Sequence, residues 1–104
     1  MKAFANQFGY SDVTPFEVVK VVSEKTVEVR KMDATKDDSV KLDWMVGGFA
    51  GHCVNQHDQK WHITSNNSNP VMRIRLGKSG EWKDRHGHRF GLADQPVKFY
   101  DYNF

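Results

Sequence analysis

Apolar and polar residues alternate in short runs along most of this chain, which is the period of a β-strand. The run 16–22 is rich in valine, and in the run 26–32 Val27 and Val29 alternate with charged residues. Three polar residues separate these runs. The pattern therefore predicts an antiparallel hairpin with a short loop.

The same alternation recurs further along the chain. In the run 71–76, Met72, Ile74 and Leu76 are expected to face inward, with the intervening arginines outward. The other predicted strands are 40–44, 60–64, 81–83, 88–92 and 97–104. Predicted loops or irregular segments are 1–12, 33–39, the glycine-rich stretch 47–51, and 65–70.

No segment carries a 3.6-residue apolar period over three turns, so no long helix is predicted. Short strands separated by frequent turns are typical of sandwiches and barrels. We therefore expect one all-β domain over residues 1–104. The expected architecture is a small barrel or strongly twisted antiparallel sheet of about five to seven short strands, with an SH3-like barrel compatible. Residues 1–12 are expected to form a loop or an extended N-terminal arm.

The chain has 104 residues and a formal net charge of +2. The charge is uneven: residues 70–98 hold seven Lys or Arg against three Asp or Glu, a net +4. The basic character is thus local to the C-terminal third. A net charge this small is below that of most dedicated nucleic-acid-binding domains.

A single cysteine, Cys53, excludes an intrachain disulfide, which fits a reducing compartment. The N-terminal residues lack the apolar run of a signal peptide. No stretch approaches the ~18 apolar residues of a membrane-spanning helix. We therefore expect a cytoplasmic protein that does not enter a membrane.

Four stretches carry a resemblance to a known family. They read GYSD at 9–12, GGFAGHCVNQ at 47–56, RLGKSGEW at 75–82 and FYDYNF at 99–104. On these motifs the chain resembles a family of small uncharacterised proteins encoded by bacteriophages and bacterial genomes. The resemblance implies a phage or mobile-element setting inside a bacterial host cell. It implies no catalytic residue and no metal site.

Four side chains near the middle of the chain are weak metal-ligand candidates: His52, Cys53, His57 and His62. Their Cys-x3-His-x4-His spacing is not that of the common zinc modules. The same residues offer a Cys–His nucleophile pair, but a lone cysteine is more often a small buried apolar residue. We expect no metal, no cofactor and no enzymatic activity.

Basic residues with interleaved aromatic and histidine residues mark the C-terminal third as a candidate binding surface. The set is Arg73, Arg75, Lys78, Trp82, Lys83, Arg85, His86, His88 and Arg89. Arg and Lys contact phosphates, and an exposed aromatic ring stacks on a base. The alternative is that Trp82 belongs to the core and the arginines only solvate a strand face.

Two further segments are open to two interpretations. Phe49 lies either in a mobile binding loop or in a bend that inserts its ring into the core. The aromatic C-terminus, residues 100–104, is either a docking strand or the last strand of the barrel.

The leading hypothesis is a phage-type accessory protein, a non-enzymatic binding module that acts on a bacterial macromolecule. Inhibition of a host or defence protein fits this setting, with the Phe49 loop and the basic hairpin 78–89 as contacts. The alternative is a nucleic-acid-binding barrel that uses the basic C-terminal third. A metal-dependent enzyme is a third class. The strand pattern fits either a monomer or a dimer formed through edge strands.

Overall fold

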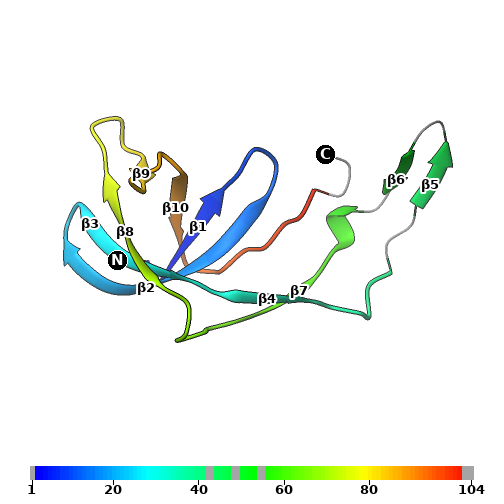
Figure 1. Cartoon of the computed structure of the whole chain (residues 1–104), viewed down its shortest axis with the longest axis horizontal. Coiled ribbons are helices and arrows are strands. Elements are labelled where there is room, and N and C mark those ends of the chain that lie inside the picture. The colour runs from blue at the N-terminus through cyan, green and yellow to red at the C-terminus, as the bar shows by residue number, and fades with distance from the viewer. Residues whose placement is uncertain (1, 42–43, 48–49, 54–55, 102–104) are drawn as a thin grey trace.

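The structure is a computed structural model that describes residues 2–41, 44–47, 50–53 and 56–101. Six antiparallel strands form a closed barrel in the order β1-β10-β9-β8-β3-β2 (Figure 1). Their bounds are β1 Phe4–Phe8, β2 Val13–Ser23, β3 Thr26–Lys31, β8 Val71–Leu76, β9 Trp82–Lys83 and β10 Arg89–Ala93. The prediction of an all-β barrel is confirmed.

The core of the barrel is built from the inward-facing positions of the alternating runs. The buried apolar residues that pack together in this core are Ala5, Phe16, Val27, Val29, Ile74 and Phe90. The Phe16 and Phe90 rings meet edge to face, with centroids 5.1 Å apart. Trp82 is partly buried and packs against this cluster, as one of the two sequence interpretations expected.

Four more strands form a projection from the barrel, residues 33–64. β4 (Asp33–Lys36) follows β3 after one residue and pairs with β7 (Trp61–Thr64). Further out, β5 (Trp44–Gly47) pairs with β6 (Ala50–Cys53), and a single 3-10 turn, η1 (Gln56–Asp58), leads back to β7.

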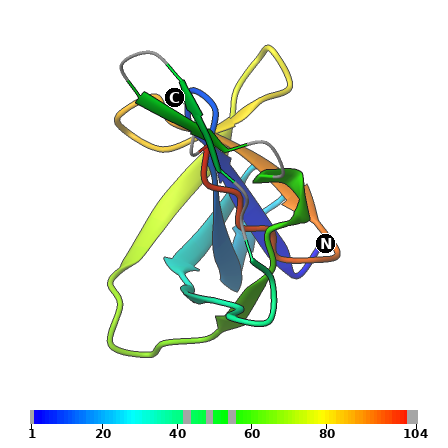
Figure 2. The ribbon, with the colours of Figure 1, turned by 90° about the vertical axis from the view of Figure 1, so that its right-hand side faces the viewer.

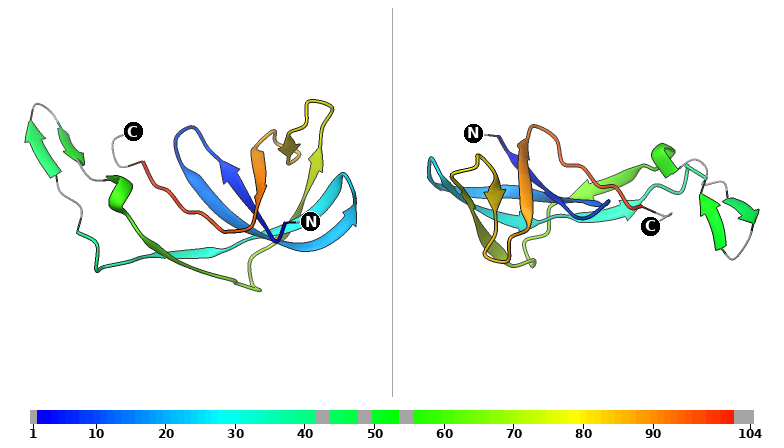
Figure 3. Two further views of the ribbon diagram at one scale, coloured as in Figure 1. Left: turned by 180° about the vertical axis from the view of Figure 1, so that it is seen from behind. Right: turned by 90° about the horizontal axis from the view of Figure 1, so that it is seen from above.

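The projection makes the molecule elongated, with extents of 50 × 28 × 21 Å. Figure 2 looks along the long axis from the outer end of the projection, and Figure 3 shows from behind and from above that the β5–β6 hairpin stays clear of the barrel. The molecule thus offers two separate regions, a barrel and a projection.

The C-terminal segment, residues 94–101, runs from the barrel toward the projection (Figure 1). The buried Asn6 side chain holds its start: Asn6 Nδ2 donates to the Gln95 carbonyl at 3.1 Å, and Asn6 Oδ1 accepts from the Val97 amide at 2.9 Å. Further along, Val13 and Phe99 form an isolated β-bridge. The segment is therefore fixed to β1 and β2.

Three predictions at the ends of the chain and in the glycine-rich stretch are wrong. Residues 4–8 are not a loop or extended arm but barrel strand β1, whose small Ala5 supplies a weak apolar signal. Residues 97–101 form no strand, because β1 and β10 already pair and close the barrel. Gly47 is not irregular: it ends β5 and pairs with Ala50 at the start of β6.

The projection contains two further differences. Residues 33–36, predicted as a loop, form β4, a strand with little burial and hence no alternating signal. Residues 40–41 of the predicted strand 40–44 are not in a strand, and 42–43 lie outside the described residues. Phe49 and residues 102–104 also lie outside them.

Candidate functional site

A groove opens beside the place where β9 ends. β9 has only two residues, which pair with Arg75 and Leu76 of β8, so residues 71–74 of β8 extend beyond this neighbour. The turn 84–88 follows β9 directly, and Asp84, Arg85, His86 and His88 of this turn line a cavity together with residues of β8. The resulting cavity has a volume of about 930 Å³.

Cationic side chains outnumber acidic ones in the walls of this groove, which we call the basic groove. Its lining residues are Gln7, Val71, Met72, Arg73, Arg75, Gly77, Lys83, Asp84, Arg85, His86 and His88. Four of them are permanent cations, and one is a carboxylate. The groove therefore favours an anionic ligand.

The cations differ in how far nearby acids neutralise them. Arg73 Nε lies 3.0 Å from Glu28 Oε2, and Lys83 Nζ lies 3.3 Å from Glu81 Oε2. Arg75 and Arg85 have no carboxylate partner within the part of the chain that the structure describes. These two guanidinium groups are the best placed to bind an anion.

Asp84 organises the turn that forms one wall of the groove. Its side chain is 2% exposed. Oδ1 accepts hydrogen bonds from the backbone amides of His86 and His88, each at 2.9 Å. Oδ2 lies 2.8 Å from Nδ1 of the His88 ring. One buried carboxylate thus fixes both the backbone of the turn and one of its side chains.

These bonds also set the charge of Asp84. Burial raises the pKa of its carboxyl, but the hydrogen bonds from the His88 ring and from the backbone amides of His88 and His86 outweigh this effect. The pKa of Asp84 is therefore lowered from its ordinary value, and Asp84 is an ionised carboxylate at neutral pH. Because a carboxylate only accepts, Nδ1 of His88 carries the shared proton.

The structure brings together most of the basic surface predicted from the sequence. The predicted residues that line the basic groove are Arg73, Arg75, Lys83, Arg85, His86 and His88. The remaining predicted residues, Lys78, Trp82 and Arg89, do not line it. Arg89 Nη1 lies 3.8 Å from Glu81 Oε1, and Trp82 is occupied by the core.

Asp84 is the charged lining residue that the sequence interpretation missed. The sequence indicates a turn at Asp84-Arg85-His86-Gly87, and Gly87 does have a φ of 86° there. The available signal was an aspartate at the first turn position, where its side chain accepts from later backbone amides. Nothing in the pattern indicated that the carboxylate also holds His88.

The weak metal-ligand candidates do not form a cluster among the described residues. Cys53 is buried, the His57 ring stacks on Phe99 at 5.6 Å, and His62 Nε2 lies 3.5 Å from Asp37 Oδ2. The side chain of His52 lies outside what the structure describes. His57 and His62 therefore each have a local contact of their own.

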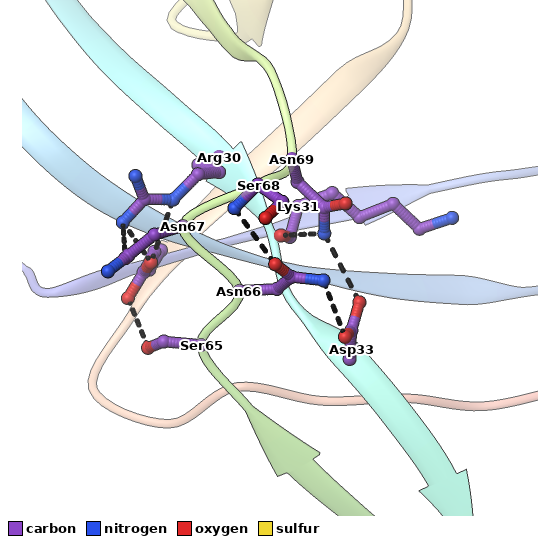
Figure 4. Close-up of polar contacts among 9 residues, drawn as sticks. Arg30, Lys31, Asp33, Ser65, Asn66, Asn67, Ser68 and Asn69 are labelled. Atoms are coloured by element: carbon purple, nitrogen blue, oxygen red, sulfur yellow. Dashed lines mark hydrogen bonds and ion pairs between the residues drawn. The ribbon is translucent and has the colours of Figure 1, made fainter.

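A polar junction joins the barrel to the projection through the loop 65–70 (Figure 4). Arg30 donates from Nη2 to Glu17 Oε1 at 2.9 Å and to Asn67 Oδ1 at 2.9 Å. The Ser65 hydroxyl donates to Glu17 Oε2 at 2.7 Å. This loop is thereby tied to β2 and β3.

The other half of the junction ties the loop to β4 and to the last residue of β3. Asn66 Nδ2 donates to Asp33 Oδ2 at 2.8 Å, and Asn69 Nδ2 donates to the Lys31 carbonyl at 2.8 Å (Figure 4). Side chains of the loop therefore bond both to the barrel and to β4 of the projection, and these bonds fix the direction in which the projection leaves the barrel.

The partners of Glu17, the acid at the centre of the junction, lower its pKa. The Ser65 hydroxyl has the largest effect and lowers the pKa of Glu17; burial opposes it, and Arg30 lowers it further. Glu17 and Arg30 therefore form an ion pair, and the Arg30 guanidinium is already bound to Glu17 and Asn67.

Comparison of the chain with protein-family models, curated proteins and solved structures found no match. The family resemblance therefore stays a prediction. Among the described residues, no helix has the length and apolar character needed to cross a membrane.

Proposed function

We propose that this protein is a non-enzymatic binding module whose basic groove binds nucleic acid. The observation that carries the proposal is the set of four cations in one groove, of which Arg75 and Arg85 have no acid partner among the described residues. Phosphate contacts of this kind supply most of the sequence-independent affinity of nucleic-acid-binding proteins.

The groove favours a single strand over a duplex. Its volume of about 930 Å³ is near the upper end of ordinary ligand pockets, ~300–1,000 Å³, and so holds a few nucleotides. A flexible single strand is able to enter a recess between a strand and a turn. A duplex holds its phosphates on a rigid surface and meets only the rim.

The proposed setting is the cytoplasm of a bacterial host, with the gene carried by a phage. The motif resemblance and the lack of a disulfide support this setting. Under the proposal the protein acts by occupying a strand rather than by altering it chemically.

Binding to a labelled oligothymidylate of about 20 nucleotides, followed by fluorescence anisotropy, tests the proposal. Counterion release from four phosphate contacts gives a log–log salt slope of about −3 for a single strand. The affinity is thus expected to fall about fifty-fold between ~50 mM and ~200 mM salt. The double variant Arg75→Glu/Arg85→Glu is expected to lose at least about tenfold at the lower salt.

A matched variant separates a groove effect from a general charge effect. Lys20→Glu/Lys60→Glu makes the same change in net charge at two exposed lysines outside the groove. It is expected to bind within about threefold of the unaltered protein. Equal loss in both double variants, or no binding by the unaltered protein, rejects the proposal.

A bacterial protein partner is the second candidate, and the projection favours it. β4 and β7 form a two-stranded sheet in which each strand has one edge without a strand neighbour among the described residues. Such edges accept an added strand from a partner. Affinity capture from bacterial lysate, with and without nuclease, separates the candidates. A stoichiometric protein that survives nuclease favours this one.

A further inference from the structure

His88 differs from the other groups of the basic groove in being held by a buried acid. Nδ1 of its ring is bound to Asp84 at 2.8 Å, so the ring cannot turn without breaking that bond. No described residue bonds to the opposite nitrogen, Nε2. The side chain is 56% exposed, and the residue lines the groove.

His86, two residues earlier, provides an internal comparison. Its Nε2 accepts a hydrogen bond from Arg85 Nε at 3.2 Å. The two rings lie close, with centroids 6.1 Å apart, yet only His88 keeps Nε2 available. The turn therefore presents one fixed imidazole nitrogen to the groove.

We infer that Nε2 of His88 is a proton-dependent phosphate ligand, and that its ligand is a phosphodiester group of single-stranded nucleic acid. The inference rests on the proposed function and assigns this role within the same groove. In the imidazolium form, Nε2 is a cationic donor that pairs with a phosphate oxygen. In the neutral form, with Nδ1 carrying the proton, Nε2 is an acceptor that repels that oxygen.

The charges around His88 act in opposite directions. Asp84 on its own turn favours the imidazolium. Arg85 on the same turn, Arg73 and Arg75 on β8, and Lys83 on β9 disfavour it. His86 adds a further positive charge when protonated, and Gln7 on β1 is neutral. A bound phosphodiester adds negative charge and shifts the balance toward the imidazolium. Protonation and nucleic-acid binding are therefore linked.

The experiment measures affinity for the oligothymidylate between pH ~5.5 and ~8 at constant salt, the range in which histidines lose their proton. The unaltered protein is expected to bind about ten- to thirtyfold more weakly at the higher pH, as for the uptake of one proton. Single-stranded RNA and duplex DNA of the same length serve as parallel probes, with RNA behaving like the oligothymidylate and the duplex binding at least tenfold more weakly.

His88→Asn is the decisive variant. The asparagine amide is able to donate to Asp84 in place of Nδ1, but nothing replaces Nε2. Its affinity is expected to change less than about threefold over the pH range. His86→Asn is the matched control and is expected to keep the full dependence. His88→Arg places a permanent cation at the position and is expected to bind well at both pH values.

The outcomes separate this inference from the function on which it rests. If the oligothymidylate binds through Arg75 and Arg85 but His88→Asn keeps the pH dependence, the role of His88 is overturned and the proposed function stands. If the unaltered protein does not bind at any pH, both are overturned. If His88→Asn is unfolded by circular dichroism, the decision passes to His88→Arg, and a pH dependence that survives in it overturns the inference.

Discussion

Gln59 and Tyr100 exchange two hydrogen bonds although they are 41 positions apart in the chain. Gln59 Nε2 donates to the Tyr100 carbonyl at 2.9 Å, and the Tyr100 amide donates to Gln59 Oε1 at 2.9 Å. The Trp61 indole donates to the same Oε1 at 2.7 Å. A side-chain amide thus takes the place of a neighbouring strand and fastens the C-terminal segment to the projection.

Gln59→Ala is expected to release this end of the C-terminal segment. The substitution removes the acceptor of two hydrogen bonds, from Trp61 and Tyr100, and the donor of two more, to the Gln56 and Tyr100 carbonyls. Only the bonds with Trp61 and Gln56 are partly buried, at a net ~1 kcal/mol or less each, so unfolding becomes easier by about 1–2 kcal/mol. Hydrogen exchange at the Tyr100 amide is expected to accelerate at least about tenfold, as its bond is lost. Amide exchange followed by NMR provides the measurement.

Gln95→Ala is the control for this change. The Gln95 side chain is exposed and makes no hydrogen bond in the described structure, whereas its carbonyl accepts from Asn6. Removal of the Gln95 side chain is expected to leave the hydrogen-exchange rate of the Tyr100 amide unchanged. Equal protection of that amide in all three proteins would show that Gln59 does not hold the segment.

Asp84→Asn is expected to lower stability in a pH-dependent manner. The pKa of Asp84 is lower in the folded protein than its ordinary value of 3.8, so the unfolded chain binds the proton more tightly. The stability that the carboxylate supplies is therefore fully present above that ordinary value and is lost as pH falls through the lower folded value.

Urea unfolding of the unaltered protein and of Asp84→Asn measures this difference. At neutral pH the variant is expected to be less stable by about 1.5–3 kcal/mol, the value of hydrogen bonds to a buried charged group. Below the ordinary value of 3.8 the difference is expected to shrink, because Asp84 takes up its proton. A difference that widens as pH falls below that value would contradict the lowered pKa.

The barrel follows from the sequence because its strands bury one face. The runs that became β2, β3 and β8 alternate apolar and polar residues, since Val27, Val29 and Ile74 face the core. β4 buries almost nothing, so its residues carry no such alternation and were predicted as a loop. Pairing with a distant strand, rather than burial, makes β4 a strand.

The basic groove follows from the sequence only in part. Composition locates the cations, but which of them share a groove depends on the short length of β9 and on ion pairs with Glu28 and Glu81. The number of charged residues also does not predict the hydrogen bond between Asp84 and His88. It depends on the path of a turn rather than on the pattern of a strand.

Glu17 and Arg30 are expected to be energetically coupled at the polar junction. Their side chains are 17% and 19% exposed, and Arg30 donates to Glu17 Oε1 from both Nη2 and Nε. A double-mutant cycle with Glu17→Ala and Arg30→Ala is expected to give a coupling of about 1 kcal/mol, above that of a fully exposed pair.

The same cycle between Arg73 and Glu28 provides the comparison. That pair has one bond at 3.0 Å, and the Arg73 side chain is half exposed. Its coupling is expected to be about 0.5 kcal/mol or less. Thermal unfolding of the variants supplies the data, and equal couplings in the two cycles would contradict a special role for the junction.

Gly87, in the turn 84–88, is expected to lose more stability on substitution by alanine than Gly77, which lines the basic groove. The φ of Gly87 is 86°, and a Cβ there would meet nothing within 4 Å. The cost of Gly87→Ala is therefore backbone strain alone, about 1–2 kcal/mol of unfolding free energy.

Gly77 is the control: it has no such φ, and its Cβ would lie 3.6 Å from the Glu81 carbonyl oxygen, an ordinary contact. Gly77→Ala is thus expected to change stability by less than about 0.5 kcal/mol or to raise it slightly, because alanine restricts the unfolded chain. Equal unfolding midpoints in urea for the two variants would show that the turn relaxes around the alanine, and the turn would then not be rigid enough to fix the His88 ring.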